Sequence, residues 1–240
     1  AIIDGVCALT GARSVHWVGH SMGGLLAYTY AAWHEGGRIA RIVTIGSPVR
    51  PGSLRALLGP FGPTLRRWLP RLPRMWARLP LFFALPLTVL LPELSMRTSG
   101  TAKHLSWRER AALLSLAFED TSPALAGHFL DAGLDRGSLL PDGDAPILAR
   151  LQVPLLAIAG RKDALASPRA VRIAVDEAGA THKRYVDLGD PDRPEDEPAL
   201  GHADLISGRQ ALAHVLPLVA AWLEDPSPGA SSALTSPRAL

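Results

Sequence analysis

The sequence predicts an α/β protein with a doubly wound, mostly parallel sheet and a long insertion between its two halves. Two observations lead to this prediction. Short β-branched runs alternate with helical segments in the first 50 residues and again after residue 150, and such alternation is typical of parallel α/β sheets. Between these stretches lies a long segment of different composition, which does not follow the alternating pattern.

The first half predicts a strand, a helix and a second strand. Residues 2–9 are predicted to form the last part of a helix. The run "SVHWVG" from residue 14 is short, β-rich and of the kind found in strands covered on both faces. A helix is predicted from Met22 to about His34. The next strand is "RIARIVTIGSP" from residue 38. Because the connections are short, these elements should form a right-handed parallel unit.

The same pattern returns in the second half. "VPLLAIAG" from Val153 predicts a strand, and residues 168–178 predict a helix. "KRYVDLG" from Lys183 predicts another strand, and residues 205–223 predict a final amphipathic helix. Both halves therefore fit one doubly wound sheet.

The domain organisation follows from these elements. Residues 1–50 and 150–225 should form one core, residues 51–149 an insertion, and residues 226–240, rich in Pro, Ser and Ala, a disordered tail. A chain of 240 residues with 48% hydrophobic content suits a packed core. The single cysteine excludes an internal disulfide, and no Cys/His set has structural-zinc spacing, so no metal is expected.

Charge narrows the range of partners. The formal net charge is +3, but the basic excess is local: arginines cluster between Arg50 and Arg110, whereas residues 187–204 are acidic. A nucleic-acid-binding protein would need a basic face with a recognition motif, and the sequence has neither. No secretory signal is visible, so a cytoplasmic location is the default expectation and the compartment stays undetermined.

The segment Gly19-His20-Ser21-Met22-Gly23 joins the first predicted strand to the next helix. Glycines two positions before and after Ser21 leave no side chains to block a sharp turn, so the serine is directed outward at the carboxyl edge of the sheet. The helix start brings unpaired N–H groups to the same place, where they could hold an oxyanion. The alternative is a glycine-serine turn with no chemical role.

A nucleophilic serine needs a base and a group that orients the base. Asp163 follows the strand "LLAIAG", and His202 lies in the loop before the last helix, so both belong at the edge that carries Ser21. An ordinary loop aspartate that caps a turn is the alternative for Asp163. His20 adjoins the serine, but its position should point its side chain elsewhere, so it is expected to shape the pocket.

Seven other histidines compete with His202 for the role of base. Apart from His20, two lie inside predicted elements and four lack a strand-end position: His16 and His214, then His34, His104, His128 and His182. This leaves His202 as the expected base.

The order serine, aspartate, histidine around "GHSMGG" resembles the α/β-hydrolase superfamily, in particular its lipase- and esterase-like members. The resemblance implies Ser21 as nucleophile, Asp163 as acid and His202 as base. It also implies the backbone N–H of Met22 as an oxyanion donor beside Gly23, and no cofactor. The insertion at residues 51–149 stands where the superfamily often places a cap or lid, so the resemblance implies a helical cap or lid there. Family members place several strands and a second oxyanion donor before this turn. Here about one helix precedes the strand "SVHWVG" and no methionine starts the chain, so a first part is expected to be missing.

These features predict a serine hydrolase that cleaves an apolar or lipid-like carboxylic ester through an acyl-serine intermediate. Three alternatives stay open: an acyltransferase, a thioesterase of the same fold, and a non-catalytic α/β protein that binds a lipid or a partner.

The predicted cap contains an uncharged run between Leu79 and Leu91, too short and too rich in proline to span a membrane. Its neighbouring tryptophans and arginines could meet a lipid interface, so peripheral membrane contact through the cap is one hypothesis. The alternative is a lid whose apolar side packs on the sheet. A second amphipathic helix is predicted over residues 105–120.

Overall fold

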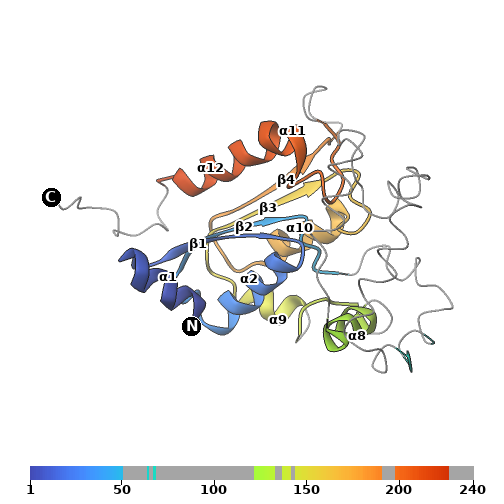
Figure 1. Ribbon diagram of the computed structural model, residues 1–240, viewed down its shortest axis with the longest axis horizontal. Helices are drawn as coiled ribbons and strands as arrows, with labels where there is room; N and C mark the ends of the chain where they lie inside the picture. The colour runs from blue at the N-terminus through green and yellow to red at the C-terminus, as the bar shows by residue number, and fades with distance from the viewer. Residues whose placement is uncertain are drawn as a thin grey trace.

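A parallel four-stranded sheet forms the centre of the part of the chain that the structure describes (Figure 1). The computed structural model describes residues 1–50, 64, 67–68, 122–132, 137–141, 144–190 and 198–226. The strands are β1 (Val15–His20), β2 (Ile39–Ile45), β3 (Leu155–Gly160) and β4 (Lys183–Leu188), and they lie in the order β1-β2-β3-β4. All three pairings are parallel, as predicted, so all four carboxyl ends meet at one edge.

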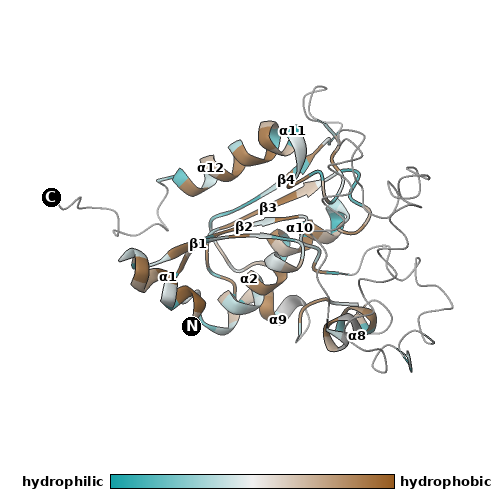
Figure 2. Cartoon of the chain, in the orientation of Figure 1, coloured by the Kyte–Doolittle hydropathy of each residue, from teal (hydrophilic) through white to brown (hydrophobic). Residues whose placement is uncertain are grey.

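Helices cover one face of the sheet through a large apolar cluster. They are α1 (Ile2–Thr10), α2 (Met22–Trp33), α9 (Asp144–Ala149) and α10 (Pro168–Glu177). Figure 2 shows brown, apolar stretches on β3 and on the helices α1 and α12. The short helix α9 falls at the end of the predicted insertion, yet its Ile147 and Leu148 are buried in the cluster together with residues of α2 and α10.

The opposite face carries α11 (Gly208–Gln210), a π-helical turn (Ala211–Val215) and α12 (Leu216–Glu224). Three buried side chains from these helices pack on residues of β2, β3 and β4: Val215, Val219 and Trp222. The sequence predicts one continuous helix over residues 205–223. In the structure the helix starts at Gly208, and it has a π-helical turn just before Pro217. Proline lacks an N–H, and its ring crowds the carbonyl of the preceding turn, which favours such an irregularity.

The prediction that the first strand is covered on both faces is wrong. β1 is an edge strand of the described sheet, its His16 side chain is exposed, and Val18 is 47% exposed. The apolar cluster beneath α12 contains residues of β2, β3 and β4 but none of β1. The β-branched composition of β1 therefore reflects strand formation rather than burial on both sides.

The helix boundaries have local causes. Gly11, with φ 71°, ends α1 in the left-handed conformation that glycine adopts without strain. The hydroxyl of Ser167 accepts a hydrogen bond from the N–H of Ala170 and so caps α10, whose first residue is Pro168. Ser122 caps α8 (Pro123–Asp131) in the same way. The predicted helix over residues 105–120, most of the predicted cap and nearly all of the predicted tail lie outside the described residues.

Candidate active site

Ser21 lies at the sharp turn between β1 and α2, with φ 52° and ψ −117°. A residue with a side chain rarely adopts this conformation, which costs about 1–3 kcal/mol and persists only where the surroundings hold it. The N–H of Ser21 donates to the carbonyl of Ile45 at 2.9 Å, and the carbonyl of Ser21 accepts from the N–H of Gly24 at 3.1 Å. The turn is therefore fixed to the end of β2 on one side and to the first turn of α2 on the other.

Two glycines allow this turn to pack closely. A Cβ on Gly19 would lie 2.5 Å from the carbonyl carbon of Gly23, and a Cβ on Gly24 would lie 2.1 Å from Oγ of Ser47. A Cβ on Gly23 would meet nothing within 4 Å. The steric requirement that the sequence analysis assigned to Gly19 and Gly23 therefore belongs to Gly19 and Gly24.

Replacing Gly24 with alanine is expected to lower the free energy of unfolding by about 1–3 kcal/mol, because the new methyl group must displace the buried Ser47 side chain. Gly23→Ala is the matched control one position earlier. It should leave stability unchanged or raise it by about 0.5–1 kcal/mol, since alanine is favoured over glycine in a helix. Urea unfolding of both variants measures the difference. Equal stabilities would contradict the packing described here.

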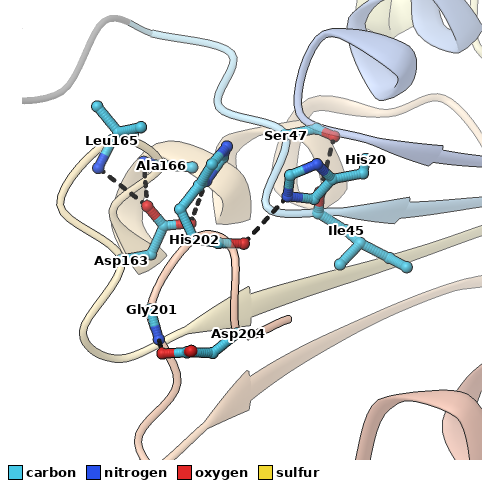
Figure 3. A network of polar contacts seen from close by, with 9 residues as sticks. All are labelled: His20, Ile45, Ser47, Asp163, Leu165, Ala166, Gly201, His202 and Asp204. Carbon is cyan, nitrogen blue, oxygen red and sulfur yellow. Dashed lines mark hydrogen bonds and ion pairs between the residues drawn. The ribbon is translucent and has the colours of Figure 1, made fainter. Parts of the chain in front are cut away.

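Asp163 and His202 form a buried pair, although they are far apart in the chain (Figure 3). His202 Nδ1 lies 2.7 Å from Asp163 Oδ2, and the Asp163 side chain is fully buried. Asp163 Oδ1 accepts two backbone N–H groups, from Leu165 at 2.9 Å and from Ala166 at 2.7 Å. Because a carboxylate only accepts, Nδ1 carries the hydrogen, and in the neutral ring Nε2 presents a lone pair.

The loop that carries His202 is attached to the loop that carries Asp163. The N–H of Lys162 donates to the carbonyl of Leu200 at 3.0 Å, and a Cβ on Gly160 would lie 2.3 Å from that same oxygen. Asp204 Oδ2 accepts the N–H of Gly201 at 3.2 Å and closes the histidine loop on itself. These contacts bring the histidine loop onto the carboxyl end of β3.

Gly46 lies between the serine turn and the Asp163–His202 pair. It follows Ile45 with φ 56°, and a Cβ there would lie 3.2 Å from Asp163 Oδ2 and 3.3 Å from His202 Nδ1. Ser21 is hydrogen-bonded to the residue directly before it. Gly46 could not be recognised as part of the site from the sequence alone, where the only signal is a glycine directly after the strand "RIVTI".

No hydrogen bond joins the Ser21 hydroxyl to His202, both of which the structure describes. The three residues thus share one edge of the sheet, and of the three only Asp163 and His202 are hydrogen-bonded to each other through their side chains. Catalytic hydrogen bonds are often long in ligand-free enzymes and tighten when substrate binds.

His20 contacts His202 directly. Its Nε2 lies 3.1 Å from the main-chain oxygen of His202, and the two ring centroids are 4.6 Å apart. Burial, and secondly the neighbouring His202, lower the pKa of His20 to about 4. The sequence alone predicts that His20 shapes the pocket but does not predict this contact, because adjacency to Ser21 does not reveal which loop approaches His20.

The lowered pKa of His20 predicts a pH-dependent stability. The unfolded chain, with a histidine pKa near 6.5, binds a proton that the folded chain rejects until about pH 4. Stability should therefore fall as the pH drops through this window, by about 3 kcal/mol in total from this group. Urea unfolding of wild type and His20→Gln across the window isolates the effect, because glutamine does not titrate. Parallel curves for the two proteins would contradict the assignment.

The remaining predicted residues lie at the start of α2. Met22 and Gly23 are its first residues, so their N–H groups have no acceptor within the helix. These groups lie at the positive end of the helix dipole. The Met22 side chain is 40% exposed. In the described part of the chain, no group of three or more His, Cys, Asp or Glu side chains is arranged to hold a metal ion. No described helix has the length and apolar composition that crossing a bilayer requires.

Comparisons with known proteins agree with this architecture. The family model described as alpha/beta hydrolase fold matches residues 1–192. No curated protein matches the chain. Similar solved structures are a hydrolase from Pseudomonas aeruginosa PA01 (TM-score 0.56, 18% identity, covering 93% of this chain and 70% of that one) and the enol-lactonase from Burkholderia xenovorans LB400 (TM-score 0.53, 18% identity, 93% and 71%). A thermophilic esterase from Thermogutta terrifontis is also similar (TM-score 0.50, 17% identity, 91% and 68%).

The matched residues include all four strands of the sheet and the turn at Ser21. The predicted resemblance to the superfamily and the predicted α/β fold with a parallel sheet are confirmed by this match and by the strand pairing, whereas the helical cap stays a prediction. The chain therefore belongs to the alpha/beta hydrolase fold family.

Proposed function

We propose that the chain is a serine hydrolase that cleaves an apolar carboxylic ester through an acyl-serine intermediate. One observation carries the proposal: the buried 2.7 Å pair of Asp163 and His202 lies at the sheet edge that also presents Ser21 on a strained turn. A serine hydroxyl is a weak nucleophile unless a base removes its proton. His202, with Nδ1 held by Asp163, has its Nε2 lone pair available for that task.

In the proposed first step, Ser21 Oγ attacks the ester carbonyl carbon while its proton moves to His202 Nε2. The carbonyl oxygen becomes an oxyanion, which the N–H of Met22 stabilises at the start of α2. The C–O bond to the alcohol then breaks, and His202 returns the proton to the leaving oxygen. Asp163 stays ionised and stabilises the imidazolium that forms in between.

In the second step, water attacks the acyl-serine and His202 again acts as the base. The acid is released and the Ser21 hydroxyl is restored. No cofactor takes part in this scheme, because Ser21 supplies the nucleophile and His202 carries every proton transfer, while Asp163 holds the imidazole without itself gaining a proton.

Exposed apolar side chains beside the three residues support an apolar substrate. Met22 follows Ser21, Leu165 lies two positions after Asp163, and Ile206 lies four positions after His202. Their side chains are 40%, 42% and 50% exposed, respectively. Ligand sites combine such apolar surface with a few polar groups that fix orientation. Two of the similar solved structures are those of an esterase and an enol-lactonase, which is compatible with ester chemistry.

A series of p-nitrophenyl esters with increasing acyl length tests the proposal. Wild type should hydrolyse them with a preference for longer, apolar chains, and Ser21→Ala should not. Product analysis with added alcohol and with a thioester distinguishes hydrolysis from the acyltransferase and thioesterase alternatives. Transfer to alcohol in preference to water, preference for the thioester, or turnover that survives Ser21→Ala would contradict the proposal.

The lipid-binding alternative rests on residues 51–97, nearly all of which lie outside the described part of the chain. Liposome flotation with and without this segment tests it. Flotation that requires the segment, in a protein with no Ser21-dependent turnover, would favour a binding protein over an enzyme.

A further inference from the structure

We propose that His20 is a positioning residue for His202, whose main-chain oxygen accepts the His20 Nε2–H, so that His20 sets the separation between Ser21 and His202. The inference rests on the proposed function, because it assigns His20 a role in the reaction of that site. Neither the family match nor the names of the similar structures assign a role to this residue.

The hydrogen bond between His20 and His202 has only one direction. A carbonyl oxygen accepts and never donates, so the 3.1 Å contact requires the hydrogen on His20 Nε2. The two rings lie against each other at 4.6 Å between centroids and 46° between planes. His20 therefore holds the histidine loop through a hydrogen bond and through ring packing (Figure 3).

This contact connects the serine turn to the histidine loop. His20 is the last residue of β1 and directly precedes Ser21. Hydrogen bonds between described residues also tie the histidine loop to the Asp163 loop, through Lys162 and Asp163, and close it on itself through Asp204. A shift of the loop away from His20 would thus move His202 away from Ser21 while its bond to Asp163 could persist.

Charge explains why an uncharged donor suits this position. His202 must take up a proton in the proposed reaction. A positive charge on His20, whose ring centroid is 4.6 Å from that of His202, would oppose that step. Burial keeps His20 uncharged above about pH 4, since its pKa is lowered to about that value. The charged group that contacts His202 is Asp163. It is bound to Nδ1 of His202 and lies on the side of that ring away from His20 (Figure 3).

Three variants separate the hydrogen bond from the ring. His20→Gln retains an N–H donor of similar reach, whereas His20→Phe retains a ring and His20→Met retains bulk, both without a donor. We expect kcat on a p-nitrophenyl ester to fall by about 10- to 100-fold in the Phe and Met variants, with KM changed by less than about twofold. The Gln variant should recover most of kcat. Circular dichroism identifies any variant that does not fold, and two donor-free variants guard against that loss.

A second readout does not depend on turnover. The His202 Nδ1 proton, held by Asp163, should give a far-downfield NMR resonance in wild type and in His20→Gln. In His20→Phe and His20→Met, this proton should exchange with water faster, because the loop is held less firmly. The same comparison in a Ser21→Ala background requires no catalysis.

The two readouts distinguish the failure of each proposal. Loss of kcat with faster proton exchange in the donor-free variants, and recovery in His20→Gln, supports the role of His20. An exchange difference in a protein without Ser21-dependent turnover would overturn the proposed function and leave the positioning role standing. Unchanged kcat and unchanged proton exchange in His20→Phe or His20→Met would overturn the His20 proposal alone. A His20→Gln variant that loses as much kcat as the two donor-free variants would also overturn it.

Discussion

Ser21→Ala is expected to lower kcat for ester hydrolysis by roughly 10⁶-fold, the largest effect of any substitution in this chain. The variant lacks the oxygen that forms the bond to the acyl group, so no covalent intermediate can form. The substrate still binds, and the Met22 N–H still stabilises an oxyanion, which leaves a residual rate above that of the reaction in water. Steady-state kinetics with the preferred p-nitrophenyl ester measures the loss.

Ser14→Ala is the matched control, because Ser14 lies just before β1, at the opposite end of the strand from Ser21. This variant should retain wild-type kcat and KM. Both variants should unfold at similar urea concentrations, so that a difference in rate reflects chemistry rather than folding. A Ser21→Ala protein with more than a hundredth of wild-type kcat would exclude Ser21 as the nucleophile.

Asp163→Asn is expected to lower kcat by about 10⁴-fold through the tautomer of His202. Two backbone N–H groups, from Leu165 and Ala166, hold Oδ1 of Asp163. The amide oxygen of asparagine must take that place, so its NH₂ group faces His202 Nδ1. Nδ1 then has to accept, the ring hydrogen moves to Nε2, and the lone pair that would remove the Ser21 proton is lost.

The control for Asp163→Asn is Asp176→Asn on the outer side of α10, where the aspartate is exposed and pairs with Arg172 at 3.5 Å. Exposed ion pairs contribute little to stability, and this one is remote from the sheet edge, so activity should not change. If Asp163→Asn retained a tenth of wild-type kcat or more, Asp163 would not be the group that orients His202.

Much of the fold could be predicted from local patterns. The alternation of β-branched runs with helical segments predicted all four strands, and Gly11 and Ser167-Pro168 are helix-boundary signals of the same local kind, because these features act within a few residues of chain. The strand-end positions of Asp163 and His202 also indicated one common edge, since carboxyl ends of parallel strands meet there.

Other features depended on contacts between distant segments and could not be predicted. The exposure of Val18 on β1 follows from which strands lie beneath α12. The need for glycine at positions 24 and 46 follows from the approach of Ser47 and of the Asp163–His202 pair. The contact between His20 and His202 likewise requires two loops to meet. A linear pattern records none of these approaches.

The central claim is that Ser21 is an activated nucleophile, and covalent labelling tests it most directly. Wild type and Ser21→Ala would be treated with a fluorophosphonate, which reacts with activated serines, and the modified residue would be mapped by mass spectrometry. The proposed site predicts one adduct, on Ser21, that is absent from Ser21→Ala and forms far more slowly in Asp163→Asn. A folded wild-type protein that stays unmodified, or that is labelled at another serine, would contradict it.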